Sequence, residues 1–471
     1  MENFNIYIVI FLLLSSIGTA KGQVKIAITQ FEPVQVSDSI VLYTAHDYLI
    51  RNIEDASNKK VWELSKGKMF SIDIGQEYSY LVIHNEALTG RNRPLLIKND
   101  LVINLEIDQA GKIAFSKNQS KLVECQLKLA LLTKYPRSKQ YKPTKEHVNN
   151  LIKARSDNHN RMDSIINSYV RYLSVGEREI LRNNCKAAID LALFSILGNI
   201  TSDSATMEYA YNEYRHIPQN TTTALLVGTL IQPALIGEYG FRREFNELKL
   251  KRTLYGQRYA FIDIYNKINA NNTGTAKDRA IAESILNELQ YDQFPINYLD
   301  SALMTVKDSV SRAVILVQKE SRSAGKALFP FVFEDAQGRK IKQSDLKGKV
   351  LVIDFWFNGC LGCAKLGKAM EDVIEEFHER GVVFLSVNVD KNREKWVEGI
   401  NSGIYTSPYN LNVYTDGQGQ NHPFLLKYKY RSFPQLMIVD KNGKLVTANA
   451  TRPFGTAKRK ELTTEIENLL K

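Results

Sequence analysis

The chain has 471 residues, of which 44% are hydrophobic and 24% are charged. This composition is typical of a globular protein that is long enough for about two to four domains. The formal net charge of +11 arises from 62 basic and 51 acidic residues, which are scattered along the chain without a basic run or a patch of interleaved aromatic residues. We therefore expect a mildly basic surface and no nucleic-acid partner.

The first 22 residues are predicted to be a cleaved export signal. An apolar stretch from Ile6 to Leu14 is followed by small residues, and Ala20 and Gly22 before Gln23 fit a signal-peptidase site. The stretch is too short for a membrane-spanning helix, which needs about 20 residues, and no later uncharged apolar run reaches that length. The sequence predicts an exported, soluble protein without stable membrane insertion after the signal peptide is cleaved.

Residues 23–118 are predicted to form a β-rich, sandwich-like domain. Short runs of alternating apolar and polar residues, separated by turn signals such as Asp108-Gln-Ala-Gly111, are typical of the strands of a small antiparallel sandwich. Five such runs lie at residues 24–28, 39–43, 78–83, 101–105 and 113–115.

Residues 119–325 are predicted to form a helical domain, because apolar residues recur there every three or four positions. One such stripe consists of Leu122, Cys125, Leu129 and Leu132. Thr144 and Ser174 are predicted helix N-caps, and Glu177 is placed to complete a capping box with Ser174. There is no regular repeat, so the sequence does not predict a solenoid of fixed period.

After the polar segment 321–325, residues 326–471 alternate between predicted strands and helices. Strand patterns lie at residues 331–333, 350–355, 382–389, 435–439 and 445–447. Helical patterns follow Cys360 and lie at residues 393–400 and 456–470. This alternation is typical of an α/β domain with a central sheet. The predicted fold class is therefore multidomain, with a β-rich N-terminal module, an all-α middle region and a C-terminal α/β domain.

The chain has four cysteines, and only two of them have a chemical context. Cys125 and Cys185 lie in helical patterns and are expected to be small buried residues rather than disulfide partners. Cys360 and Cys363 stand three residues apart, where a strand pattern gives way to a helical one, so they can close a small disulfide. The first thiolate then faces the partially positive helix N-terminus, which is expected to lower its pKa.

A C-x-x-C pair is also half of a typical zinc site. A complete site needs two more ligands, and the sequence has neither a second C-x-x-C pair nor a nearby pair of histidines. We therefore expect no metal and no organic cofactor, and we interpret Cys360 and Cys363 as a redox-active disulfide.

Four segments near the C-terminus carry a resemblance to a known family. They are Phe329-Pro-Phe-Val-Phe-Glu-Asp-Ala-Gln-Gly338, Ser344-Asp-Leu-Lys-Gly-Lys349, Asp354-Phe-Trp-Phe-Asn-Gly-Cys-Leu-Gly-Cys363 and Ser432-Phe-Pro-Gln-Leu-Met-Ile-Val-Asp440. Residues 326–471 thereby resemble a thioredoxin-fold domain of the exported TlpA/ResA type of thiol-disulfide oxidoreductase. The whole arrangement is similar to multidomain proteins of Bacteroidetes periplasms, which implies a periplasmic location.

The resemblance assigns a role to each of five residues. Cys360 is expected to attack a substrate disulfide, and Cys363 to resolve the mixed disulfide that forms. Asp354, on an otherwise apolar strand, is expected to take up or relay the proton of Cys363, with a pKa raised by burial. Pro434 is expected to be cis and to pack against the disulfide, while the backbone of Phe433 pairs with an extended substrate.

Trp356, Leu361 and Gly362 complete the predicted substrate-binding residues. Four positions depart from the family pattern. Gly359 stands where thioredoxins usually carry Trp, and Leu361 and Gly362 stand where Gly-Pro is common. Leu366 replaces the acid that ResA-like proteins carry three residues after the second cysteine. The direction of electron flow and a specificity for apocytochromes are therefore not carried over.

The leading hypothesis is an exported oxidoreductase that reduces protein disulfides and is regenerated by a membrane thiol donor. A second hypothesis is a binding protein whose thioredoxin domain is an accessory redox sensor. A third is a thiol peroxidase, although Ile353 and Phe357 replace the Pro and the Thr or Ser that a peroxiredoxin needs. His378 and His422 are expected at the surface, because a thioredoxin-type site needs no histidine.

Overall fold

The computed structural model describes residues 23–31, 39–45, 49, 59–63, 69–83, 94–107, 113–135, 143–218, 225–226, 228–229, 231–256, 260–289, 297–430 and 432–471. The predicted signal peptide, residues 1–22, lies outside the described residues. The chain divides into two compact units, Met1–Glu283 and Ser284–Lys471. The predicted domain boundaries at residues 118 and 325 remain predictions.

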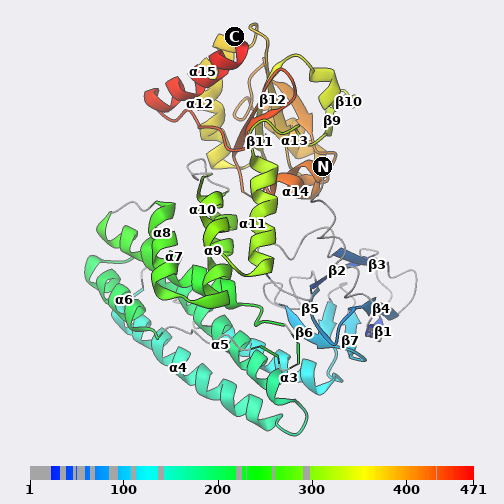
Figure 1. Ribbon diagram of the computed structural model, residues 1–471, viewed down its shortest axis with the longest axis vertical. Coiled ribbons are helices and arrows are strands. Elements are labelled where there is room, and N and C mark those ends of the chain that lie inside the picture. The colour runs from blue at the N-terminus through cyan, green and yellow to red at the C-terminus, as the bar shows by residue number, and fades with distance from the viewer. Residues whose placement is uncertain are drawn as a thin grey trace, which may run out of the picture. The chain divides into compact units, whose positions relative to one another are not determined.

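The first unit begins with two four-stranded sheets, drawn in blue and cyan in Figure 1. One sheet has the order β4 (Met69–Asp73), β1 (Gln23–Phe31), β7 (Val102–Ile107) and β8 (Ile113–Phe115). The other has the order β3 (Lys59–Glu63), β2 (Ser39–Ala45), β5 (Tyr78–Ile83) and β6 (Leu95–Lys98). The prediction of an antiparallel sandwich is wrong at one pair, since β1 and β7 run parallel. All four strands of the other sheet lie between β1 and β7 in the sequence, so β7 does not return from β1 as a hairpin.

The two sheets share one hydrophobic core with the first helices of the unit. This core contains buried residues of β1, β2, β5 and β7 and of helices α3 to α5. The predicted apolar stripe of α3 (Lys121–Ala130) and the 3₁₀ helix Leu131–Thr133 is confirmed, because all four of its members are buried. Gln126 of α3 also bonds to β6: its side chain accepts from the Leu96 N–H (2.8 Å) and donates to the Leu96 carbonyl (2.9 Å).

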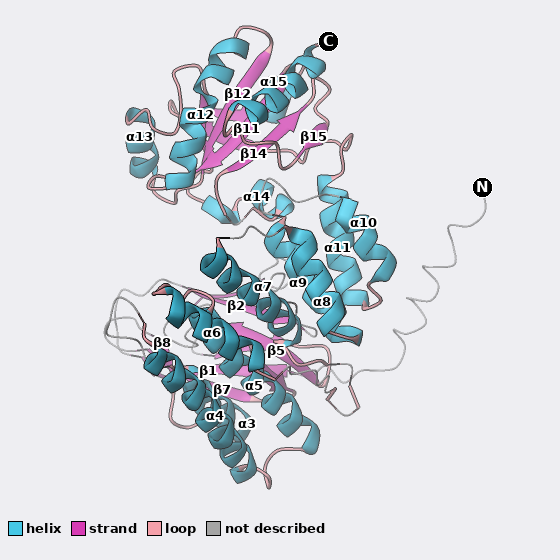
Figure 2. Ribbon diagram, turned by 90° about the vertical axis from the view of Figure 1, so that its left-hand side faces the viewer, coloured by secondary structure: helices cyan, strands magenta, loops and turns pink. Residues whose placement is uncertain are grey.

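The rest of the first unit is helical, with the helices drawn in cyan in Figure 2, and α3 contacts strand β6. The helices are α4 (Lys145–Ser168), α5 (Val175–Leu197), α6 (Ser204–His216), α7 (Ile236–Tyr255) and α8 (Phe261–Asn271), and α9 (Gly274–Glu288) continues past the division into units. Both predicted N-caps are confirmed, Thr144 on α4 and Ser174 on α5, where Glu177 completes the capping box. Glu177 also accepts a hydrogen bond from Lys98 of β6 (2.8 Å), which joins α5 to the sheet.

The second unit contains α10 (Asn297–Thr305) and α11 (Ser309–Arg322), followed by the predicted α/β domain. Its sheet has the order β10 (Lys340–Lys342), β9 (Val332–Asp335), β13 (Leu411–Tyr414), β12 (Val382–Asn388), β11 (Val350–Trp356), β14 (Gln435–Val439) and β15 (Leu445–Thr447). The helices are α12 (Leu361–Phe377), α13 (Arg393–Asn401), α14 (Pro423–Tyr428) and α15 (Thr456–Leu470), with 3₁₀ helices at Gln343–Leu346 and Gly419–Asn421. The predicted fold class is confirmed.

The central strand β11 is buried on both faces, which explains its nearly continuous apolar sequence. Val350 and Val352 belong to a cluster with residues of α12 and α15. Leu351, Ile353 and Phe355 belong to a second cluster with residues of α14. Because β11 lies between the parallel strand β12 and the antiparallel strand β14, its C-terminal end delivers the chain to the start of α12 in the middle of the domain.

Helix α11 packs against α14 through a buried arginine. The guanidinium of Arg322 donates to the side chain of Gln318 and to the backbone carbonyl of Tyr428. Burial lowers the pKa of Arg322 to about 10. Helix α11 is thus part of the packing of the second unit, although it precedes the predicted thioredoxin-like segment.

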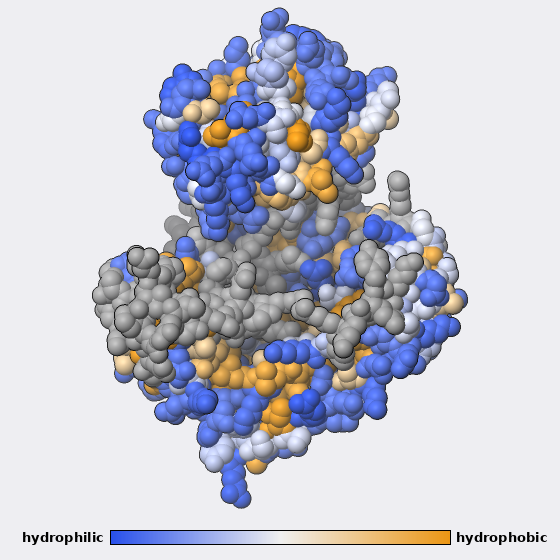
Figure 3. Space-filling model, turned by 180° about the vertical axis from the view of Figure 1, so that it is seen from behind, coloured by the Kyte–Doolittle hydropathy of each residue, from blue (hydrophilic) through white to orange (hydrophobic). Residues whose placement is uncertain are grey.

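The surface of the described chain is mostly polar. In the face drawn in Figure 3, hydrophilic residues cover most of the described surface and hydrophobic residues form small groups. None of the described helices combines the length and the apolar character that crossing a membrane requires.

Candidate redox site at the start of helix α12

Cys360 and Cys363 form a disulfide at the N-terminus of α12. Cys360 is the N-cap residue of this helix, and its Sγ atom accepts a hydrogen bond from the backbone N–H of Cys363 (3.1 Å). Gly359 precedes it with a φ of +92°, in the region that residues with a Cβ atom rarely adopt. The Gly359 N–H donates to the hydroxyl of Tyr405 (2.8 Å), which fixes the turn between β11 and α12.

The two cysteine residues differ slightly in exposure. Cys360 is 6% exposed and Cys363 is 3% exposed. This order favours Cys360 as the sulfur that exchanges with a substrate, because attack requires access to the sulfur. Leu361, the next residue, is 81% exposed and projects from the first turn of α12. A client that reaches Cys360 therefore meets an apolar side chain beside it.

The Phe433–Pro434 peptide bond is cis, which confirms the conformation that the resemblance implies. The Cys360 Sγ atom lies 3.9 Å from the carbonyl oxygen of Phe433. A Cβ atom added to Gly362 would lie 3.0 Å from Cδ of Pro434, so the glycine allows the proline to pack closely on the first turn of α12. Arg452 donates to the carbonyl of Pro434 (2.7 Å) and holds the proline loop from the other side.

Asp354 lies on β11 and has a strongly shifted pKa. Burial raises the pKa of its carboxyl from 3.8 to about 7, and a weak hydrogen bond from Ser386 (3.5 Å) opposes this shift. The residue keeps some accessible surface because it lines a cavity of about 330 Å³ between α12, the sheet and the loop 403–410. Protein therefore surrounds the carboxyl, while the cavity gives it a path for proton exchange with water.

Trp356 is 1% exposed and lies in a cluster with both cysteines, Trp396, Tyr405 and Tyr414. Its indole stacks on Tyr405 at a centroid distance of 4.7 Å, and its Nε1–H donates to Ser386 (2.8 Å). This position in the core does not favour the predicted direct contact with substrate. The structure thus brings together both cysteines, Gly362, Phe433 and Pro434, and it leaves Trp356 behind the disulfide.

Three residues of the site were not predicted from the sequence: Tyr405, Arg452 and Ser386. The first two come from loops without a distinctive sequence pattern. Ser386 did have a signal, because it is a lone polar residue within the apolar run of β12. An isolated hydroxyl at such a position must find a hydrogen-bond partner when it is buried.

The prediction that His422 lies at the surface is wrong. The side chain is buried, and its Nδ1 atom accepts a hydrogen bond from the Phe424 N–H (3.3 Å). Its Nε2 atom lies 3.2 Å from the carbonyl oxygen of Val332. His422 therefore caps α14 and ties it to β9, a packing role that the sequence pattern did not reveal. His378 is partly exposed at the end of α12.

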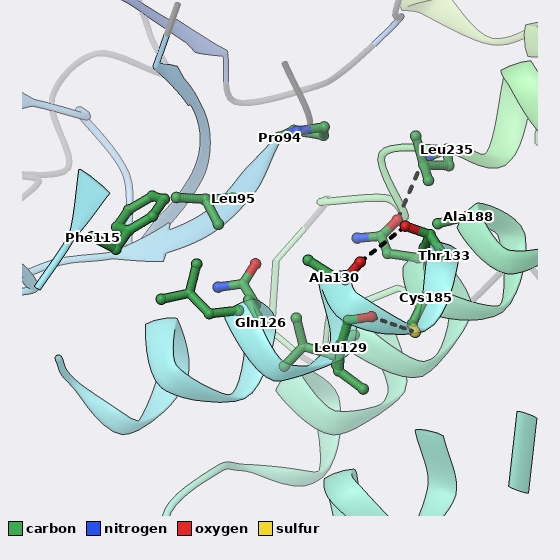
Figure 4. A pocket seen from close by; sticks show the side chains of 13 residues that line it. Pro94, Leu95, Phe115, Gln126, Leu129, Ala130, Thr133, Cys185, Ala188 and Leu235 are labelled. Atoms are coloured by element: carbon green, nitrogen blue, oxygen red, sulfur yellow. Dashed lines mark hydrogen bonds between the residues drawn. The ribbon is translucent and has the colours of Figure 1, made fainter. Parts of the chain in front are cut away.

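A small pocket in the first unit offers no comparable chemistry. Figure 4 shows it where β6, β8, α3 and α5 meet, with a volume of about 80 Å³ and mostly apolar walls. The thiol of Cys185 lies 3.8 Å from the carbonyl oxygen of Leu129. Cys125 and Cys185 are both buried and outside the disulfide, as predicted, and burial raises the pKa of Cys125 to about 12. A thiol that stays protonated is a poor nucleophile.

Comparison with known proteins identifies the family. Residues 324–448 match the AhpC/TSA family. The chain is 30% identical over 132 residues to the thiol-disulfide oxidoreductase ResA of Bacillus subtilis (strain 168). The aligned residues cover 28% of this chain and 70% of that protein. The ResA of Geobacillus thermodenitrificans (strain NG80-2) is 29% identical over 146 residues, or 30% of this chain and 78% of that protein. The chain belongs to the thiol-disulfide oxidoreductases. This confirms the resemblance inferred from the sequence.

Solved structures of thiol-disulfide oxidoreductases also align with about a third of this chain. A putative thiol-disulfide oxidoreductase from Bacteroides vulgatus is 23% identical, with a TM-score of 0.27. The alignment covers 31% of this chain and 96% of the solved one. A putative thiol:disulfide interchange protein DsbE from Chlorobium tepidum is 22% identical and covers 32% of this chain and 99% of that chain, also with a TM-score of 0.27. In this thiol-disulfide oxidoreductase, Cys360 and Cys363 are the one bonded pair among four cysteines, all of them described.

Proposed function

We propose that the protein is an exported oxidoreductase that reduces disulfides in other proteins. The observation that carries this proposal is the Cys360–Cys363 disulfide at the N-terminus of α12, whose first turn lies against the cis Pro434 at Gly362. In the reduced protein, the Cys360 thiolate attacks one sulfur of a client disulfide, and the other client sulfur leaves as a thiolate. The Cys363 thiolate then attacks Cys360 and releases the client. Two electrons pass to the client, and the Cys360–Cys363 disulfide forms.

Two features of the site support this mechanism. The backbone N–H of Cys363 and the N-terminal end of α12 direct positive potential at Cys360, which stabilises a thiolate there. Asp354, with a pKa near 7, is suited to take the proton of Cys363 at neutral pH, since a base works best when its pKa lies near the working pH.

The partners follow from the chemistry of the dithiol. An extended client can pair with the backbone of Phe433 beside the disulfide, with Leu361 and Gly362 as further contacts. A reductase that ends each turnover as a disulfide needs a thiol donor, and for a periplasmic protein we assign this role to a membrane thiol donor. The predicted signal peptide supports export, and the domains before residue 324 are proposed to bind clients or partners.

The test is reduction of insulin disulfides by purified protein. Cys360→Ser is expected to abolish the activity, and Cys185→Ser, which removes a buried thiol outside the disulfide and in the other unit, is expected to retain it. In the native periplasm, Cys363→Ser is expected to accumulate mixed disulfides with clients through Cys360, identifiable by mass spectrometry. A wild-type protein that is inert towards disulfides and captures no client would refute the proposal.

The same variants separate the two alternatives. A thiol peroxidase would consume peroxide rapidly in a reaction that depends on Cys360. A binding protein with an accessory redox sensor would still bind its partners in the Cys360→Ser variant. Its wild-type form would not reduce insulin disulfides.

A further inference from the structure

Ser386 links two residues of the site that are far apart in the sequence. It lies on β12, directly opposite Asp354 in the parallel pairing with β11, and it is 0% exposed. Its Oγ atom accepts a hydrogen bond from Nε1 of Trp356 (2.8 Å) and lies 3.5 Å from Oδ2 of Asp354, to which it donates. The three side chains form a chain of hydrogen bonds behind the disulfide.

The direction of this chain is determined by Trp356. An indole N–H donates and never accepts, whereas a hydroxyl has one hydrogen and two lone pairs. When Trp356 donates to one lone pair of Ser386, the hydroxyl hydrogen is left for the acceptor that remains, which is the Asp354 carboxyl. The buried indole therefore turns the serine into a fixed donor toward the acid.

Among the described residues that line the cavity with Asp354, none carries a positive charge. The titratable ones are Glu371, Glu375, Tyr405 and Tyr409, which are acids and phenols from α12 and the loop 403–410. From β14 the apolar Leu436 lines the same cavity. Lys368 pairs with Glu371 (2.6 Å) rather than with Asp354. The Ser386 hydroxyl is the side-chain donor that favours the ionised carboxyl.

We infer that Ser386 is a positioning residue whose hydroxyl, oriented by Trp356, holds the Asp354 carboxyl and tunes the pH at which this group accepts the proton of Cys363. The inference rests on the proposed function, because it gives Asp354 its role in resolving the mixed disulfide. It also assigns a role to Trp356, which orients the Ser386 hydroxyl through its Nε1–H and does not contact the substrate.

The test measures the Asp354 carboxyl directly, by ¹³C NMR titration of the oxidised full-length protein. In Ser386→Ala the midpoint of the titration is expected to rise by roughly one pH unit, because a donor to the charged form is lost. Trp356→Phe keeps an aromatic ring against Tyr405 but frees the serine hydroxyl, so a smaller rise is expected. Ser386→Thr retains the hydroxyl and is expected to restore the wild-type midpoint.

The pH profile of insulin reduction provides a second readout. In Ser386→Ala, the midpoint of this profile is expected to shift in the same direction as the titration midpoint of the Asp354 carboxyl. In a protein that already carries Asp354→Asn, adding Ser386→Ala is expected to leave the midpoint of the profile unchanged. A carboxyl midpoint that is the same in wild type, Ser386→Ala and Trp356→Phe overturns the inference. Since the NMR titration needs no client, a shifted midpoint in a protein that proves inert towards disulfides upholds the hydrogen-bond chain and refutes the proposed function instead.

Discussion

At the scale of single residues, the main energetic cost of the site is the carboxyl of Asp354. Its pKa is 3.8 in an ordinary setting and about 7 in the folded protein. Between these values the folded state keeps a proton that the unfolded state has lost, so the free energy of unfolding falls as the pH rises through this window. The loss is at most about 4 kcal/mol above pH 7, and the partial exposure of Asp354 to the cavity reduces it.

Asp354→Asn is therefore expected to stabilise the second unit at pH 8 by up to a few kcal/mol and to change its stability little at pH 4.5. The measurement is urea denaturation at both values of pH. Glu467→Gln, which alters an exposed carboxyl of α15, is the control and is expected to have little effect at either. If the stability of the Asp354→Asn protein depends on pH in the same way as that of the wild type, the pKa of the Asp354 carboxyl is not raised in the folded protein. The same variant is expected to slow disulfide reduction.

The residues of the site differ in how far the sequence reveals them. Cys360 and Cys363 were predictable because a dithiol turn is written in consecutive residues, and Pro434 because its segment matches a family pattern. Ser386 meets Asp354 only through the register of β11 and β12, which pairs residues 32 positions apart. That contact depends on tertiary structure, which local patterns do not specify.

At the scale of elements, α12 depends on a close approach to the loop 403–410. A Cβ atom added to Gly367, in the second turn of this helix, would lie 2.7 Å from the carbonyl oxygen of Ile404 and 3.1 Å from that of Tyr405. Backbone atoms have little freedom to move away. The glycine therefore lets the helix that begins with the dithiol lie directly against the loop that carries Tyr405.

Gly367→Ala is expected to destabilise the second unit by about 1–3 kcal/mol, because the added methyl group overpacks the contact. Helix propensity alone predicts the opposite sign, a gain of about 0.5–1 kcal/mol. Thermal unfolding of the full-length protein decides between them. Lys365→Ala, at an exposed position of the same helix, serves as the control. A more stable Gly367→Ala protein would mean that the loop yields to the methyl group.

Most elements of the second unit were predictable, and those missed share a property. The strands 435–439 and 445–447 and the helix 456–470 agree with the structure at both ends. The missed elements are β10, β13, α14 and the two 3₁₀ helices, each of three to six residues. Such short segments complete less than two helical turns or a few alternations, so no periodicity develops within them.

At the scale of the whole molecule, a buried charge links the β-rich and helical parts of the first unit, in addition to their shared hydrophobic core. Burial alone would raise the pKa of Glu177, but hydrogen bonds from Lys98 and the Ser174 backbone hold it below its usual value. Glu177 is buried, and the hydroxyl of Tyr78 also donates to it (3.3 Å). The helical pattern predicted only the capping box, because the partners on β5 and β6 lie some 80 to 100 residues away.

Lys98→Met is expected to destabilise the first unit by about 1–3 kcal/mol at pH 7, because it leaves the buried carboxylate of Glu177 without its cation. The effect is limited because the Lys98 side chain is itself partly exposed to water in the wild type. Two calorimetric transitions are expected for two compact units, and only one of them should move. Insulin reduction at 25 °C should be unchanged, because the dithiol belongs to the other unit. Lys60→Met, at an exposed position of β3, is the matched control. If both transitions shift together, the units do not unfold independently.

The two hydrogen bonds between Gln126 and the backbone of Leu96 also bear on strand pairing between two molecules of the protein. β6 is the last strand of its sheet, and an uncovered edge of this kind can recruit a strand from a second molecule and begin aggregation. The amide of Gln126 bonds to the N–H and the carbonyl that a foreign strand would use. One side chain of a helix thus closes this sheet edge to self-association.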